Sequence, residues 1–104
     1  MDPSVERNVA VELSTLMSEL LGKGVDWVMT EVMGNRALAY GGSDDPAAFV
    51  RLKSIGLKQS DCPELSKAIC AFLVKQLSVP QNRVYIEFTD LDRTMFGWDG
   101  TTFG

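Results

Sequence analysis

Apolar side chains recur with the period of a helix along the first part of the chain. Asp2 can act as an N-cap, and Pro3 suits a first turn, where its missing N–H is not needed. Glycines at positions 22 and 24 end the pattern. The sequence therefore predicts a helix from Pro3 up to Gly22, with this apolar stripe: Val5, Val9, Leu13, Leu16, Met17, Leu20 and Leu21.

Two apolar stretches after this helix predict strands. Val25 to Met33 is rich in β-branched and large apolar residues, and Ala37 to Tyr40 is a shorter stretch of the same kind. Residues 34–36 read as a turn and residues 41–46 as a loop. The first half is thus helix followed by strand, without an opening strand.

The second half predicts strand, helix and strand. From Ala47 to Ile55, the side chains of Phe49, Arg51, Lys53 and Ile55 alternate with the others and share one face. Glu64 to Leu77 carries a helical apolar stripe, and Arg83 to Thr89 reads as a strand. A parallel unit of this kind closes right-handed, with its helix over one face of the sheet.

These elements predict one α+β domain that spans residues 1–104. We expect two similar β-α-β units, a four-stranded sheet and two helices on one of its faces, with the first strand missing in this chain. The other face of the sheet, and an aromatic tail that includes Phe96, Trp98 and Phe103, would stay exposed in a monomer. Both features indicate an oligomer.

Composition narrows the possible partners. The chain has 104 residues, a formal charge of −4 and no histidine, so it lacks the basic stripe of a nucleic-acid-binding protein. No apolar run approaches the roughly 20 residues of a membrane span, and no signal peptide opens the sequence. We expect a soluble, intracellular protein.

The cysteines predict neither a disulfide nor a metal site. Cys62 and Cys70 fall on one expected helix, which places their Cα atoms about 12 Å apart, too far for a disulfide. Two cysteines without histidine make a poor zinc site. Cys70 is best interpreted as a buried apolar residue, with a reactive thiol as the alternative.

Five motifs in order and spacing carry a family resemblance. They are Leu21-Gly-Lys23, the loop from Tyr40 to Pro46, Lys53-Ser-Ile-Gly56, Arg83-Val-Tyr-Ile86 and the tail from Gly97 to Phe103. Together they closely resemble the macrophage migration inhibitory factor family of the tautomerase superfamily, over essentially the whole chain. The resemblance implies a cofactor-independent homotrimer that isomerises keto and enol forms of small aromatic 2-oxo acids, such as phenylpyruvate, or of dopachrome.

The family's catalytic base is an amino-terminal proline, and here the chain departs from the pattern. An apolar pocket lowers the pKa of that secondary amine, so that it can act as a neutral base near pH 7. Pro3 is not equivalent, because its nitrogen is a tertiary amide after Asp2. The catalytic residue is therefore unknown. A shortened sequence, a family member retained for binding, and a replacement carboxylate remain as three explanations.

The resemblance implies substrate-binding roles for Lys23, Ile55 and Tyr85. Lys23 would attract the substrate carboxylate, Ile55 would line the site, and the ring of Tyr85 would reach a neighbouring subunit's pocket. The residues alone allow other interpretations: a cation at a helix C-terminus, strand core and half-buried packing, respectively.

Glu87 and Phe96 complete the predicted site. Glu87 stands where relatives commonly carry Asn, on the same strand face as Tyr85, and a carboxylate there would disfavour an anionic substrate. It is also the candidate replacement base, or a solvated or Lys-paired residue. Phe96 would lie beside the pocket mouth or serve only subunit packing. The thiol pair of vertebrate members corresponds to Ala47 and Val50, so no thiol redox activity carries over.

Two functions follow from these observations. The first is a tautomerase whose proline base is absent from this sequence. The alternative is a non-catalytic, cytokine-like or binding protein on the same trimeric scaffold. We expect a cytoplasmic location, with secretion lacking a signal peptide as the alternative.

Overall fold

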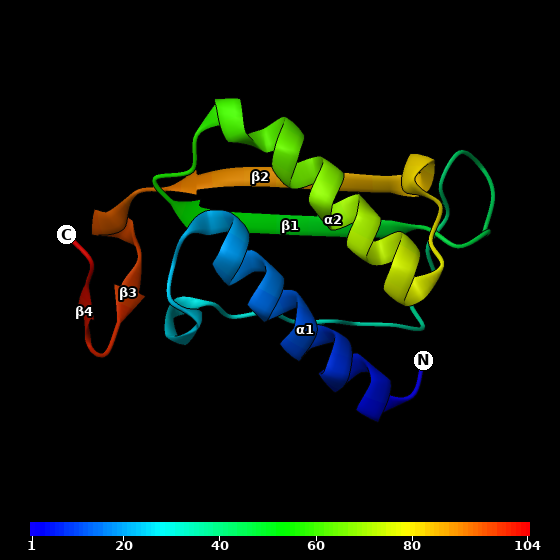
Figure 1. Ribbon diagram of the computed structural model, residues 1–104, viewed down its shortest axis with the longest axis horizontal. Coiled ribbons are helices and arrows are strands. Elements are labelled where there is room, and N and C mark those ends of the chain that lie inside the picture. The colour runs from blue at the N-terminus through cyan, green and yellow to red at the C-terminus, as the bar shows by residue number, and fades with distance from the viewer. The chain divides into compact units, whose positions relative to one another are not determined.

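The computed structural model describes residues 1–104, which divide into two compact units, Met1–Asp44 and Asp45–Gly104 (Figure 1). The first unit holds helix α1 (Pro3–Leu21) and a short 3-10 helix (Val25–Trp27). The second holds strand β1 (Ala48–Ile55), helix α2 (Cys62–Leu77), strand β2 (Val84–Leu91) and the short strands β3 (Gly97–Trp98) and β4 (Thr101–Thr102). The predicted α+β class is confirmed.

Helix α1 begins and ends where its capping residues predict. The carboxylate of Asp2 accepts hydrogen bonds from the backbone N–H of Ser4 at 2.7 Å and from its hydroxyl at 2.6 Å. At the other end Gly22 takes the left-handed conformation, with φ of 64°, which glycine adopts at little cost. Val9 and Met17 are the buried residues of the helix. The predicted helix is confirmed.

The two strands predicted at 25–33 and 37–40 are wrong. Val25–Trp27 forms a 3-10 turn, residues 28–39 have no regular structure, and Tyr40 pairs only with Ser43 in an isolated bridge. β-Branched composition favours a strand, but a strand also needs a hydrogen-bonded neighbour, and no segment among residues 1–104 pairs with this one. Residues of this segment bond to α1 instead.

Two of these bonds are specific. The hydroxyl of Thr30 donates to the carbonyl of Ala10 at 2.6 Å, and the backbone N–H of Gly34 donates to the carboxylate of Glu6 at 3.0 Å. Because both acceptors belong to α1, the segment stays beside the helix without a sheet ladder.

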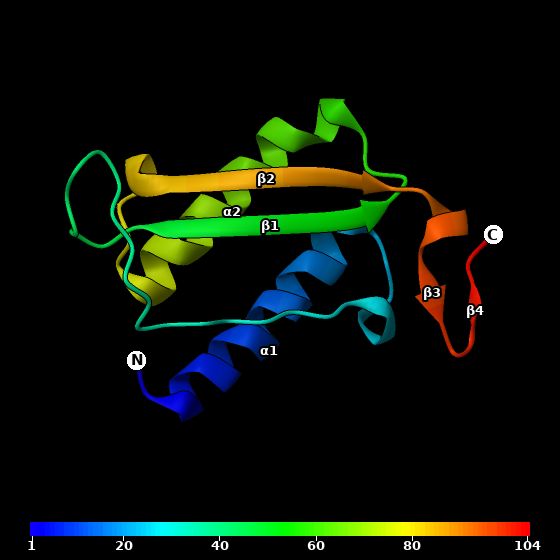
Figure 2. The same ribbon diagram turned by 180° about the vertical axis from the view of Figure 1, so that it is seen from behind.

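The second unit is a parallel strand–helix–strand unit, as predicted. Strands β1 and β2 pair in parallel along their whole length, with Ala48 opposite Val84 and Ile55 opposite Leu91. Helix α2 connects them and covers one face of the sheet, as the front and back views both show (Figures 1 and 2). The right-handed crossover thus leaves the other face of this sheet without a helix from its own unit.

The core of the second unit lies between α2 and one face of this sheet. Leu65, Ile69 and Leu73 are buried along one side of α2, and Leu52 is the buried apolar residue of β1. Cys70 is buried as well, which confirms its interpretation as a core residue, and both cysteines are free. Ile69 is the most enclosed side chain, with 2 % of its surface exposed.

The aromatic tail folds as a small antiparallel hairpin. Strands β3 and β4 pair with Gly97 opposite Thr102 and Trp98 opposite Thr101. Asp99 and Gly100 form the turn, with φ of 52° and 81°. Positive φ at both central residues is typical of a type I′ turn, whose twist suits a two-residue hairpin.

Removing the enclosed side chain at position 69 tests this core. We expect Ile69→Ala to lower the free energy of unfolding by about 2–5 kcal/mol, because it deletes buried methyl groups and leaves a cavity. Urea unfolding followed by circular dichroism measures the change. Val74→Ala on the same helix is the matched control, since Val74 is 45 % exposed and its truncation should change the stability little. Equal losses in both variants would contradict this packing.

Candidate functional site

Lys23 lies in the first unit, directly after the cap of α1. The backbone N–H groups of Gly22 and Lys23 both donate to the carbonyl of Ser18, and the Ser18 hydroxyl donates to the carbonyl of Lys23. The cap therefore fixes the backbone at Lys23, and its side chain is half-buried. This position suits a cation, since the carbonyl end of a helix is negative.

Ile55 lies in the second unit, at the carboxyl end of β1. The turn that follows is held by Asp90, whose carboxylate accepts hydrogen bonds from the backbone N–H groups of Gly56 at 3.0 Å and Leu57 at 3.2 Å. Gly56 itself has φ of 77°, a conformation that favours glycine. Ile55 is half-buried and faces Leu91 across the ladder.

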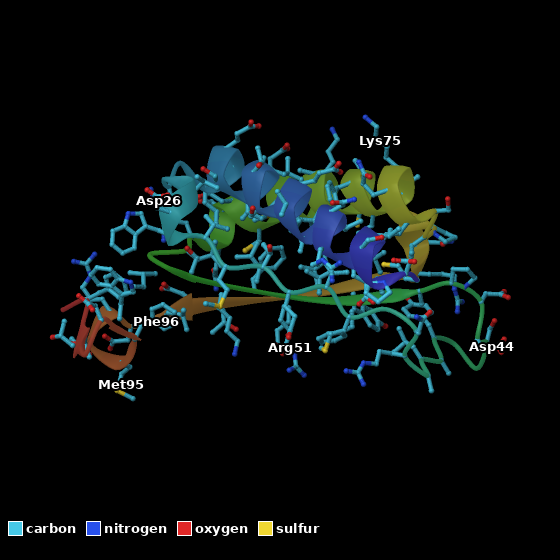
Figure 3. All side chains as sticks on the ribbon, turned by 90° about the horizontal axis from the view of Figure 1, so that it is seen from below. Asp26, Asp44, Arg51, Lys75, Met95 and Phe96 are labelled. Carbon is cyan, nitrogen blue, oxygen red and sulfur yellow. The ribbon has the colours of Figure 1, made fainter.

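Phe96 belongs to the tail, which leaves the same end of the sheet. A turn at Arg93–Met95 precedes it, and the carboxylate of Asp92 caps this turn by accepting from the N–H of Thr94 at 2.9 Å and from its hydroxyl at 2.6 Å. Both hydrogen bonds lower the pKa of Asp92 below 3.8, and the bond from the Thr94 hydroxyl has the larger effect. Figure 3 shows Met95 and Phe96 together at this turn and hairpin.

Three rings on the hairpin form what we call the tail aromatic cluster: Phe96, Trp98 and Phe103. The ring of Phe103 stacks on Phe96, with centroids 5.9 Å apart, and on Trp98 at 6.2 Å. The N–H of Phe103 also donates to the carbonyl of Phe96. All three rings remain exposed, by 36 to 54 %. The cluster is therefore an ordered apolar surface beside the end of β2.

Tyr85 lies toward the other end of the same sheet, and Glu87 lies near the middle of β2. Tyr85 is 62 % exposed and stands opposite Phe49, near the start of β2. Leu91, the partner of Ile55, lies six positions further along β2, which corresponds to about 20 Å along a strand. Within the second unit, the structure thus brings Ile55 and Phe96 to one end of the sheet and leaves Tyr85 near the other.

Glu87 has a partner that the sequence did not identify. Arg51 stands directly opposite it in the parallel register, with its Nε 3.9 Å from Oε1 of Glu87. The guanidinium carbon of Arg51 also lies 5.4 Å from the centroid of the Phe49 ring. Arg51 projects from the face of the sheet opposite α2 (Figure 3). The alternation in the sequence places Arg51 on one face with Phe49 and Lys53, but the sequence contains no signal for which face is open or for the cross-strand partner.

Pro3 is the first residue of α1, and its nitrogen is an amide, as the sequence predicts. It borders an open hollow of about 270 Å³ on the first unit, together with Glu6, Ala10 and Thr30. Glu6 and Thr30 already form hydrogen bonds within that unit, and the charged side chains of Arg7 and Glu31 also line the hollow. No cluster of three or more His, Cys, Asp or Glu residues could hold a metal ion, and none of the helices has the length and apolarity needed to cross a bilayer.

Comparison with known proteins decides the family. The sequence profile described as macrophage migration inhibitory factor (MIF) matches residues 2–104. The chain belongs to the MIF family. The resemblance carried by the five motifs is thereby confirmed, and a MIF-like function follows at the level of the family.

Individual MIF relatives agree in sequence and in fold. The chain is 37 % identical over 93 residues to macrophage migration inhibitory factor of Xenopus tropicalis, covering 88 % of this chain and 81 % of the relative. It is 38 % identical over 96 residues to the Brugia malayi homologue, covering 88 % and 80 %. The solved structure of the Prochlorococcus marinus homologue matches with a TM-score of 0.93 at 34 % identity, over 100 % of this chain and 92 % of that one.

The Asp92 cap leads to a pH prediction. Its folded-state pKa is lowered from 3.8, so the carboxylate's contribution to the turn is present above that ordinary value and is lost as the pH falls through the folded pKa. We expect the amide resonance of Thr94, followed by NMR between pH 6 and 2, to titrate with a midpoint below 3.8. Asp92→Ala should abolish this titration. A midpoint at or above 3.8 would rule out the cap in solution.

Proposed function

We propose that this MIF-family protein is a homotrimeric tautomerase that interconverts the keto and enol forms of small aromatic 2-oxo acids such as phenylpyruvate, or of dopachrome. Family membership supports an activity of this class. The residues assigned to the pocket are Lys23, Ile55, Tyr85, Glu87 and Phe96. We place the protein in the cytoplasm, where two free cysteines are expected to stay reduced, with secretion lacking a signal peptide as the alternative.

The distribution of these residues over the β1–β2 sheet is the observation that carries the proposal. Ile55 and Phe96 lie at the carboxyl end, whereas Tyr85 lies about 20 Å away along the strand and is largely exposed. A small aromatic acid is too short to contact both ends of one sheet. A pocket that uses all three residues therefore needs Tyr85 from one chain and Ile55 and Phe96 from another, as a cyclic trimer provides.

The proposed chemistry is a proton transfer without a cofactor. Lys23 attracts the substrate carboxylate, and the side chains of Ile55, Tyr85 and Phe96 enclose the ring. A neutral amine removes a proton from the carbon next to the carbonyl, and the oxygen of the resulting enolate takes up a proton to give the enol. The reverse steps return the keto form.

The base in this scheme is an amino-terminal proline outside the 104 residues. None of the four prolines of the sequence has a free amine, and Pro3 is fixed in α1 by the amide bond to Asp2. The same observation favours the second candidate function, a non-catalytic binding protein on this scaffold, for the chain of 104 residues alone. The two functions differ in what happens when a proline-initiated strand is supplied.

Extending the chain tests the activity. We expect a protein with an opening strand of about ten residues that begins with proline to accelerate phenylpyruvate enolisation, followed by ultraviolet absorbance of the enol. Replacing that proline by glycine should lower the rate about 10²- to 10⁴-fold, the usual contribution of a general base. The chain of 104 residues is the control without a base. An intact extended trimer with no activity would contradict the tautomerase and leave the binding protein as the remaining candidate.

The oligomeric state is a separate prediction. We expect sedimentation equilibrium of the extended protein to give three times the 11.4 kDa mass of the 104 residues, plus the mass of the added strands. The exposed aromatic rings of the open face and the tail favour such an assembly because water no longer contacts them there. A monomer at all micromolar concentrations would remove the shared pocket, and with it the proposed site.

A further inference from the structure

The open face of the β1–β2 sheet presents three cross-strand pairs in a row. In the parallel register Phe49 stands opposite Tyr85, Arg51 opposite Glu87 and Lys53 opposite Thr89. All of these side chains are exposed except that of Thr89, which is half-buried. They share one face because alternate residues of a strand point to the same side. An aromatic pair thus adjoins a charged pair and a further cation.

Two partners place Arg51 between the aromatic and the acidic side chains. Its Nε lies 3.9 Å from the Glu87 carboxylate, and its guanidinium carbon lies 5.4 Å from the centre of the Phe49 ring. Arg51 and Glu87 are 68 % and 55 % exposed, so solvent weakens each contact. Both contacts nevertheless hold the guanidinium of Arg51 near Glu87 and Phe49. This positive charge is therefore closer to Tyr85 than the charge of Lys53 is.

This placement changes the electrostatics next to Tyr85. Glu87 follows Tyr85 by two residues on the same face, and an unpaired carboxylate there would repel a carboxylate ligand. Arg51 offsets that charge across the strand pair. Lys53 adds a second cation, so the three charged groups of this face sum to +1.

We propose that Arg51 is a specificity-determining residue, which neutralises Glu87 and thereby allows the surface around Tyr85 to accept an aromatic carboxylate. The inference rests on the proposed function for the class of ligand, but it does not depend on the catalytic base. In this arrangement the ring of the ligand packs against Tyr85, and Arg51 cancels the repulsion that Glu87 exerts on the ligand's carboxylate. Glu87 without Arg51 would select neutral aromatic molecules instead.

Binding to the extended trimer, with its opening proline replaced by glycine, tests this role without any need for turnover. NMR titrations of isotope-labelled protein compare phenylpyruvate with phenylacetone, a neutral molecule of similar shape without the carboxylate. We expect Arg51→Gln to weaken phenylpyruvate binding about two- to fivefold, the range of exposed charge interactions, and to leave phenylacetone binding unchanged. Glu87→Gln should strengthen phenylpyruvate binding. The variant that carries both Arg51→Gln and Glu87→Gln should bind phenylpyruvate with an affinity close to that of wild type. Lys53 then gives this face the same net charge of +1 as in wild type.

Lys75→Gln is the matched control. It removes one positive charge from the same unit, but Lys75 is exposed on α2, on the other side of the sheet from Arg51 (Figure 3). Its binding of phenylpyruvate should equal that of wild type. A dispersed NMR spectrum of each variant establishes that it is folded.

Several outcomes would overturn the proposal. One is that Arg51→Gln binds phenylpyruvate as tightly as wild type does, and another is that this variant loses as much affinity for phenylacetone as for phenylpyruvate. A third is that Lys75→Gln loses as much affinity for phenylpyruvate as Arg51→Gln does. The fourth is that phenylpyruvate shifts no resonance near Tyr85 in the protein without these substitutions. Failure of the tautomerase proposal gives a different result. Charge-dependent binding here, combined with no enolisation by the extended trimer, would support the role of Arg51 and exclude the catalytic function.

Discussion

The parallel pairing of β1 with β2 is the constraint on which the second unit depends. Side chains fasten this register near both ends. The guanidinium of Arg83 donates to the carbonyls of Asp45 and Pro46, ahead of β1, at 3.0 Å each. At the carboxyl end Asp90 accepts two backbone N–H groups from the turn after β1. A slip of one residue would turn every side chain to the other face and take Leu52 out of the core.

The same register determines the chemistry of the open face. Burial of Leu52 against α2 on one side forces Arg51 and Lys53 outward on the other. Because β2 follows the same alternation, Tyr85 and Glu87 also face outward, and their order along the strand decides which of them meets Phe49 and which meets Arg51. The register of β1 and β2 thus determines both the packing of the core and the electrostatics of the candidate site.

Local signals explain how much the sequence predicted. The N-cap at Asp2, the glycine at position 22 and the apolar stripe between them define α1 almost alone. The hairpin turn at Asp99–Gly100 carries an equally local signal, because an Asp-Gly pair favours a type I′ turn. Residues 25–33 have strand-like composition, but a strand depends on a partner elsewhere in the chain, which composition does not reveal. The Arg51–Glu87 pair was unpredictable for a similar reason, since its register is set across a long helical crossover.

The charges on the open face have a consequence beyond ligand selection. Within residues 1–104, β1 and β2 each hydrogen-bond to a strand on one edge only, and such edges can recruit strands from other molecules and begin aggregation. Neither strand contains a proline to block this pairing. Arg51, Lys53 and Glu87 interrupt the apolar surface of the two strands, and charged side chains of this kind oppose stacking of sheets. These three residues therefore make unspecific stacking of this face less favourable than it would be for an uncharged apolar face.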